Sequence, residues 1–143
     1  MLEKYPNEVK LIFKNFPLTK HRFAKRAAMA AFAARRQGKF WEFHDLLFEN
    51  FDRLSDQKIW QIARELGLDL ERFEKDMKDL VLVAKINQEI RLGARAGVRG
   101  TPTIFINGRV SRAKTLKGLQ GAVEKEVARI GKGTAAGGKP LKQ

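Results

Sequence analysis

The sequence contains no cysteine, and this absence excludes several kinds of chemistry at once. Without a thiol the chain has no disulfide bond, no thiolate nucleophile and no thiolate ligand for a metal ion. Histidine is scarce too: His21 and His44, even with Asp45, do not supply the number and spacing of ligands that a metal site needs. No metal ion or other cofactor is therefore expected, and cysteine usage gives no information about the redox environment.

Long apolar runs and a surplus of acidic residues are also missing. No apolar run approaches the roughly 18–20 residues of a membrane span, and residues 1–6 lack the apolar core of an export signal. Lys and Arg number 29 against 16 Asp and Glu, which gives a net charge of +13. That charge permits attraction to nucleic acid, but the basic residues are spread along the chain and form no zinc-finger, RNP or leucine-zipper pattern.

The composition is otherwise that of a single globular domain, with 143 residues, 43% hydrophobic residues and ten Phe. Apolar spacing and capping residues predict, in order, a strand at 9–16, helices at 20–36 and 39–50, helices capped by Ser55, Asp69 and Asp79, a hairpin at 103–111, and a last helix capped by Thr115. Near the ends of these helices Phe51, Leu80 and Leu116 are expected to face the core. The same is expected of Trp41, Trp60, Phe40, Phe43 and Phe48, which are more typical of a core than of a peptide groove.

Residues 100–109 read Gly-Thr-Pro-Thr-Ile-Phe-Ile-Asn-Gly-Arg and are the most informative stretch of the chain. Asn107-Gly108 predicts a hairpin, because a type I′ turn needs positive φ at both central positions. The β-branched and aromatic run at 103–106 is typical of a strand that is buried on both faces. Pro102 stands at the mouth of that strand, where proline is tolerated. The residues alone favour an ordinary trans bond there, since only ~5–6% of such bonds are cis in folded proteins.

The decapeptide resembles the cis-proline loop and following hairpin of the DsbA-like thiol–disulfide oxidoreductases, a branch of the thioredoxin superfamily. A second set of motifs agrees with it in chain order: Phe-Lys-Asn-Phe-Pro-Leu at 13–18, an alanine-rich segment at 27–34, and Gln-Gly-Lys-Phe-Trp-Glu-Phe-His-Asp-Leu-Leu-Phe at 37–48. These are similar to the family's second strand and first inserted helices. The resemblance extends from about Tyr5 to about Ile130.

The resemblance implies an α/β chain with a partial thioredoxin-like fold. In that fold a helical insertion, at about 20–96, separates the strand at 9–16 from the hairpin at 103–111. The thioredoxin-like domain is expected to occupy residues 1–131 and to be followed by a flexible basic tail at 132–143.

Family members begin with a strand and a Cys-x-x-Cys helix, and residues 1–5 look like the last turn of that helix. The domain is thus expected to be incomplete at its N-terminus, with three explanations open: a fragment of a longer gene product, which is favoured, half of a split pair, or a degenerate paralogue. The missing strand would leave sheet edges unpaired. Either the strand at 9–16 pairs directly with the hairpin, or another chain fills the gap. We expect a homodimer, formed by domain swapping or edge pairing, or pairing with a missing N-terminal half.

By the same resemblance, Gly100, Thr101 and a cis Pro102 are expected to bind an extended peptide or protein substrate, with Arg99 beside them. Arg99 and Arg109 flank this loop, although such arginines are more often solvated. General acid–base work by His44 and Asp45 is not expected, because sequence neighbours on a helix point apart. No residue of this chain is expected to be catalytic.

The family exchanges disulfides in protein substrates through a mixed-disulfide intermediate. A chain without a thiol is expected to be redox-inactive, so enzymatic activity is left open. The alternative is a non-catalytic peptide-binding or chaperone-like module, and the third hypothesis is a basic nucleic-acid-binding protein. Intact family members are usually exported or periplasmic, whereas this chain shows no signal peptide.

Overall fold

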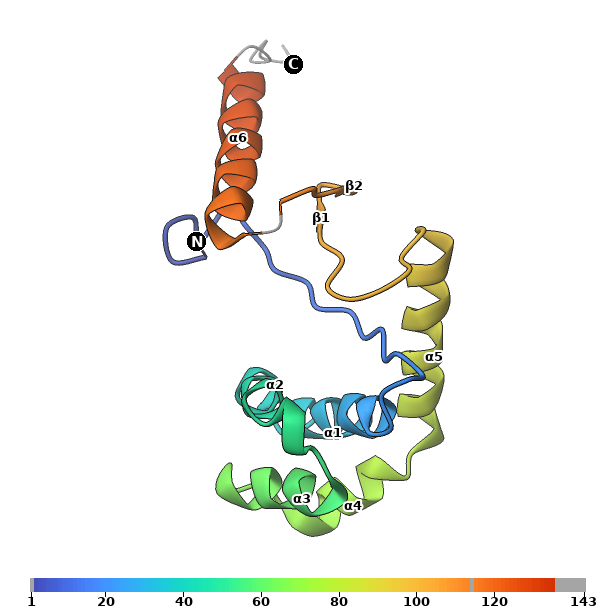
Figure 1. Ribbon diagram of the computed structural model, residues 1–143. Helices are drawn as coiled ribbons and strands as arrows, with labels where there is room; N and C mark the ends of the chain where they lie inside the picture. The colour runs from blue at the N-terminus through green and yellow to red at the C-terminus, as the bar shows by residue number, and fades with distance from the viewer. Residues whose placement is uncertain (1, 114, 136–143) are drawn as a thin grey trace, which may run out of the picture. The chain divides into compact units, whose positions relative to one another are not determined.

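The computed structural model describes residues 2–113 and 115–135 of the chain. They fall into two compact units, one formed by Lys14–Thr101 and the other by the described residues of Met1–Phe13 and Pro102–Gln143. The first unit is helical, and the second holds a small hairpin and the last helix (Figure 1).

The helical unit contains α1 (Ala24–Arg35), α2 (Phe40–Glu49), the 3₁₀ turn η1 (Phe51–Arg53), α3 (Asp56–Glu65), α4 (Leu70–Met77) and α5 (Leu80–Arg95). All five predicted helices are present. The first starts later than its prediction of 20–36, because residues 19–23 form turns in which the His21 N–H donates to the Leu18 carbonyl and the Ala24 N–H to the His21 carbonyl.

Local side-chain chemistry starts three of these helices as the sequence predicts. Ser55 Oγ accepts from the Lys58 N–H at 3.1 Å, Asp69 Oδ1 accepts from the Arg72 N–H at 3.0 Å, and Asp79 Oδ1 accepts from the Val81 N–H at 2.8 Å. Each cap satisfies a backbone donor that would otherwise lack an intrahelical partner. The caps therefore fix where α3, α4 and α5 begin.

Helix α1 is the centre of the packing in this unit and contacts α2, α3, α4 and α5. Its alanines are small enough to let neighbouring helices approach closely, and Ala30, Ala33 and Ala34 are fully buried. Around it, Phe43 of α2 and Phe73 of α4 are also fully buried, with ring centroids 5.7 Å apart. The core thus combines the alanines of α1 with larger aromatic and aliphatic side chains, among them Phe32 of α1 itself and Ile59, Ile62 and Ile86 of α3 and α5.

A charged cluster ties the end of α1 to α4 and α5. Arg36 Nη1 donates to Asp76 Oδ1 at 2.5 Å, and Arg36 Nη2 donates to Asp79 Oδ2 at 2.6 Å. Both hydrogen bonds raise the pKa of Arg36, and the bond to Asp76 has the larger effect. The Val81 N–H, and after it Arg36, lower the pKa of Asp79. The loop between α4 and α5 is therefore held by charge-assisted hydrogen bonds.

The second unit contains an antiparallel hairpin, β1 (Phe105–Ile106) and β2 (Arg109–Val110), followed by α6 (Leu116–Ala135). Phe105 lies opposite Val110, and Asn107 and Gly108 have φ values of 48° and 77°, which confirms the predicted turn. Thr115 Oγ1 accepts from the Gly118 N–H at 3.1 Å, so the predicted cap of the last helix is also confirmed.

The last helix reaches residue 135, beyond the predicted end of the domain at 131. From residue 136 onward the predicted tail at 132–143 lies outside the described residues.

The predicted strand at 9–16 does not form. Residues 9–18 run without helix or strand assignment, and among the described residues the sheet holds only the two short strands of the hairpin. A strand needs a hydrogen-bonding partner, and no described segment provides one. For the same reason the run at 103–106 is not buried on both faces: Phe105 is 38% exposed.

Five side chains that were predicted to face the core are exposed instead, among them Phe48 of α2 at 62%. Phe51 falls in η1, after the regular spacing of α2 has ended, and Leu80 and Leu116 are the first residues of their helices. Trp41 is on the outer side of α2, whereas Trp60 packs edge-on against Phe73 with ring centroids 5.2 Å apart. Helical spacing alone overestimates burial at helix ends, where no neighbouring element covers the side chain.

Two phenylalanines on α2 allow a matched test of this core. We expect Phe43→Ala to lower the free energy of unfolding by about 3–5 kcal/mol, because it opens a cavity at a fully buried site. Phe48→Ala removes a ring that is 62% exposed and should cost less than about 1 kcal/mol. Urea unfolding followed by far-ultraviolet circular dichroism measures both. Equal costs would show that the packing around Phe43 is not as described.

Candidate functional site

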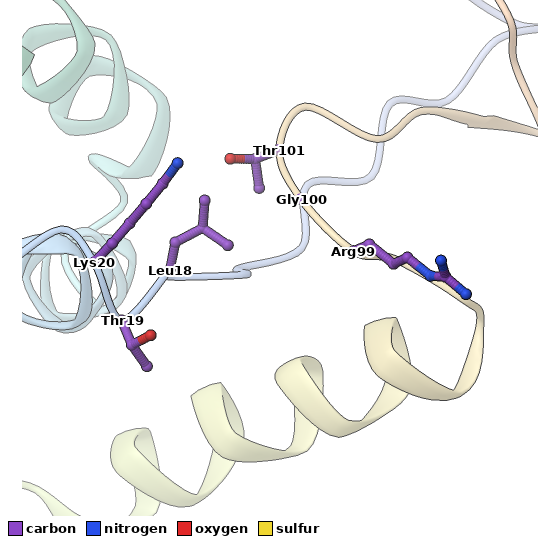
Figure 2. Close-up of a pocket in the computed structure, with 6 residues that line it drawn as sticks. All are labelled: Leu18, Thr19, Lys20, Arg99, Gly100 and Thr101. Carbon is purple, nitrogen blue, oxygen red and sulfur yellow. The ribbon is translucent and has the colours of Figure 1, made fainter.

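A pocket of about 340 Å³ lies in the helical unit, between the segment that leads into α1 and the segment that leaves α5. Its lining residues are Leu18, Thr19, Lys20, Arg99, Gly100 and Thr101. Figure 2 shows the Lys20 ammonium and the Thr101 hydroxyl directed toward the same space, whereas the Arg99 side chain extends away from them. The pocket thus presents one cation and one hydroxyl beside an apolar side chain.

The wall at 99–101 is set by the way α5 ends. Gly97 has a φ of 79°, a conformation that favours glycine, and the Val98 N–H donates back to the Gly93 carbonyl at 2.9 Å. This reversal turns the chain away from the helix axis directly before Arg99. The loop therefore starts from a fixed helix terminus.

The wall at 18–20 is held against α5 by close packing. A Cβ atom added to Gly93 would lie 2.8 Å from the Phe16 ring, so the ring occupies space that only a glycine leaves open. Pro17 follows and has no backbone N–H to enter a sheet ladder. The contact between Phe16 and Gly93 therefore sets the distance from α5 at which this wall runs.

A buried carboxylate anchors the same segment. Glu89 of α5 is 5% exposed, and its Oε2 accepts from the Asn15 backbone N–H at 2.8 Å and from Asn15 Nδ2 at 3.0 Å. Lys14 Nζ lies 3.5 Å from Glu89 Oε1 and balances part of the buried charge. The carboxylate thus satisfies a backbone donor that a neighbouring strand would otherwise take.

Sequence reasoning found one wall of this pocket and missed the other. Arg99, Gly100 and Thr101, predicted as substrate-binding residues, do lie together on it, and Pro102 follows as an exposed residue that is not among the lining residues. Lys20 and Glu89 were missed. For Glu89 a signal was present, because it follows Leu82 and Ile86 at helical spacing on the buried side of α5.

The other candidates fall elsewhere. Arg109 is in β2 of the second unit, and His21 is exposed ahead of α1. The expectation that His44 and Asp45 point apart is wrong, since His44 Nδ1 and Asp45 Oδ1 are 2.9 Å apart at the surface of α2. Their side chains bend toward each other because Asp45 is well exposed and free to choose its rotamer.

The described residues show neither a metal-binding cluster nor a membrane-spanning helix. They contain no group of three or more His, Asp or Glu side chains arranged to hold a metal ion. None of the helices in the described ranges is long and apolar enough to cross a membrane.

Comparison with known families places the chain in one of them. The model of the family described as "Thioredoxin" matches residues 1–125, so the chain belongs to the thioredoxin family. Its structure is similar to that of a thioredoxin-like oxidoreductase from Silicibacter pomeroyi DSS-3, with a TM-score of 0.73 and 32% identity over 87% of this chain and 72% of that one. The recognition of a thioredoxin-like α/β fold from the sequence is therefore confirmed.

A second solved structure identifies the branch of the family. The thiol-disulfide exchange protein alpha-DsbA2 from Wolbachia pipientis matches with a TM-score of 0.72 and 27% identity, over 80% of this chain and 64% of that one. The chain is thus a DsbA-like relative that has no cysteine.

Among curated proteins, the chain is 41% identical over 102 residues to "Na(+)/H(+) antiporter NhaA 3" of Salinispora tropica. The match covers 71% of this chain and 16% of the antiporter. The chain therefore spans about one sixth of the length of this curated relative, and the activity in that name is the relative's.

Removal of the Glu89 carboxylate tests how the pocket wall is held. We expect Glu89→Ala to leave two buried donors of Asn15 without an acceptor, a loss of about 1.5–3 kcal/mol. Hydrogen exchange at the Asn15 amide should then accelerate by about 10- to 100-fold. Gln88→Ala, the exposed neighbour on the same helix, should leave that rate unchanged. An unaltered rate in Glu89→Ala would mean that this carboxylate does not hold the segment.

Proposed function

We propose that this chain forms the substrate-side part of a DsbA-like thiol–disulfide oxidoreductase site, and that by itself it binds extended peptides without exchanging disulfides. The observation that carries the proposal is the segment from Arg99 to Thr101, directly before Pro102, which borders a pocket in a DsbA-like chain that has no thiol. In this proposal the Thr101–Pro102 bond is cis, as the resemblance to the family implies.

The chemistry of exchange explains the division between binding and reaction. Disulfide exchange begins when a thiolate sulfur attacks one sulfur of a disulfide, forms a mixed disulfide and releases the second sulfur as a thiolate. This chain has no sulfur that can attack or be attacked in that way, because its sulfur atoms are all in methionine. Any thiol pair that acts beside the loop would have to come from another polypeptide segment.

Binding of a peptide does not need the sulfur. The backbone of an extended peptide can pair with the backbone groups of the loop at 99–103, as strands pair at a sheet edge. Leu18 offers an apolar contact, and Lys20 offers a cation that would favour an acidic side chain or a free carboxylate near the pocket. The proposed ligand is therefore an extended peptide with an acidic group close to the bound residues.

Two assays on one set of variants test the proposal. We expect no reduction of insulin by dithiothreitol above the rate without protein, together with saturable binding of a fluorescent, unfolded, cysteine-free peptide in fluorescence anisotropy. Pro102→Ala should weaken that binding by about 1 kcal/mol, roughly fivefold, because it changes the backbone beside the peptide. Pro6→Ala, at an exposed proline in the N-terminal turns, is the matched control and should bind like the parent. Insulin turnover above background, or equal binding by both variants, would contradict the proposal.

A second proposal concerns how the sheet is completed. Four apolar side chains of the second unit are exposed, with exposed fractions of 53% for Leu11, 63% for Ile12, 38% for Phe105 and 58% for Val110. A two-stranded hairpin is marginal by itself, and open strand edges recruit further strands. We propose that a second copy of the chain pairs with this unit.

Light scattering after size-exclusion chromatography tests the pairing. The expected mass is twice the 16.3 kDa of the chain, and it should fall toward the monomer on replacement of Ile12 by Lys, which puts a charge on the proposed edge. Glu8→Lys, a charge change at an exposed residue of the preceding turn, should not alter the mass. A concentration-independent mass of 16.3 kDa would rule out this second copy.

A further inference from the structure

Helix α2 exposes two neighbouring rows of side chains on its outer side. The first row, which we call the aromatic face, consists of Trp41, His44 and Phe48. The second row, which we call the acidic stripe, consists of Glu42, Asp45 and Glu49. In both rows the residues are three or four positions apart, so they lie on the same side of the helix. The buried side of the same helix is formed separately, by Phe43 and Leu47. The two exposed rows are therefore not needed for the core of the helical unit.

The aromatic face is a continuous row of rings. The ring centroids of Trp41 and His44 are 5.4 Å apart, and those of His44 and Phe48 are 4.7 Å apart. Trp41 is 43% exposed and Phe48 is 62% exposed, whereas His44 between them is half-buried, with 19% of its side chain exposed. The next aromatic residue, Phe51 in η1, is 77% exposed. Aromatic residues in contact with one another and open to solvent are typical of interaction surfaces.

The charge beside this face is opposite to that of the chain. Residues 40–52 include Glu42, Asp45, Glu49 and Asp52 and no Lys or Arg, the longest stretch without a basic residue in a chain of net charge +13. Glu42 accepts from Lys39 at 3.2 Å, whereas Glu49 and Asp52 form no ion pair within the described ranges. The region is thus locally acidic on a basic protein.

Helix stability does not account for the position of Glu49. It is the last residue of α2, where the partial negative charge of the helix terminus opposes a carboxylate. The other helices of this unit have a basic residue in the last turn, and α2 has none. A carboxylate at this position costs local stability, which is consistent with a role in binding.

We propose that the aromatic face and the acidic stripe together bind a basic amphipathic helix of a partner protein. From Trp41 to Phe48 the face spans two helical turns, about 10 Å, which matches apolar anchors at positions i, i+3 or i+4 and i+7 of a partner helix. Lys or Arg beside those anchors would lie against the acidic stripe. Anionic lipid, nucleic acid and acidic peptides are disfavoured here, because the stripe repels them.

Binding of a designed peptide, followed by NMR at the two tryptophan indoles, tests this surface. The probe is a capped leucine–lysine peptide of about 14 residues, four helical turns, with all leucines on one face, and the comparison probe has glutamate in place of lysine. We expect the lysine peptide to shift the Trp41 indole N–H signal saturably and to leave Trp60 unmoved. The positive net charge of the whole chain favours the glutamate peptide instead. A Trp41 shift with the glutamate peptide but not with the lysine peptide would therefore overturn the proposal.

Two charge reversals provide a matched pair. Glu49 and Glu65 are exposed residues at the ends of α2 and α3, and replacing either by Lys changes the net charge equally. Glu49→Lys should weaken binding of the lysine peptide by about threefold or more, whereas Glu65→Lys should weaken it by less than about twofold. Phe48→Ala should weaken it at least as much as Glu49→Lys, while its circular dichroism spectrum is unchanged. Equal effects of the two reversals would contradict binding at the acidic stripe.

Two further outcomes separate this proposal from the function proposed above. Pro102→Ala should bind the lysine peptide like the parent, so failure of the loop to bind extended peptides leaves this surface intact. If Phe48→Ala instead converts a dimer into a monomer in light scattering, the face is covered by a second copy, and the proposed partner helix is wrong.

Discussion

The buried hydrogen bonds between Glu89 and Asn15 support the part of the molecule on which the candidate site depends. The segment at 9–18 has neither helix nor strand structure and no neighbouring strand in the described chain, so its buried backbone donors need another acceptor. At Asn15 that acceptor is a side-chain carboxylate from α5. Together with the packing of Phe16 on Gly93, this interaction holds the pocket wall at 18–20 against α5. The other wall, at 99–101, follows the end of the same helix.

The features of this fold that depend on neighbouring residues could be predicted from the sequence. The features that depend on pairing between distant segments could not. The caps at Ser55, Asp69, Asp79 and Thr115 and the Asn107-Gly108 turn depend on a few adjacent residues, so the sequence predicted them correctly. The strand at 9–16 was predicted from its side chains, yet a strand forms only with a partner that lies elsewhere in a sheet. The same reason explains the candidate site. The loop at 99–101 was identified by a local motif, whereas Lys20 joins it, and Glu89 bonds Asn15, only through folding of distant segments.

Membership of the thioredoxin family and the lack of cysteine bear on different aspects of function, the first on the fold and the second on the chemistry. The family match and the DsbA-like structures define the class of fold. The composition removes the reacting atoms from this chain. In the proposed function the loop recognises peptide, and the aromatic face of α2 is proposed as a second surface, beside which the local charge is opposite to that of the whole chain.

The most direct test of the account is a backbone amide NMR titration with an unfolded, cysteine-free peptide that carries acidic residues. The account predicts saturable shifts of the Gly100, Thr101 and Thr103 amides, with the amides of α4 unmoved. Shifts scattered over the basic surface, with none at the loop, would contradict the claim that this loop recognises peptide without a thiol.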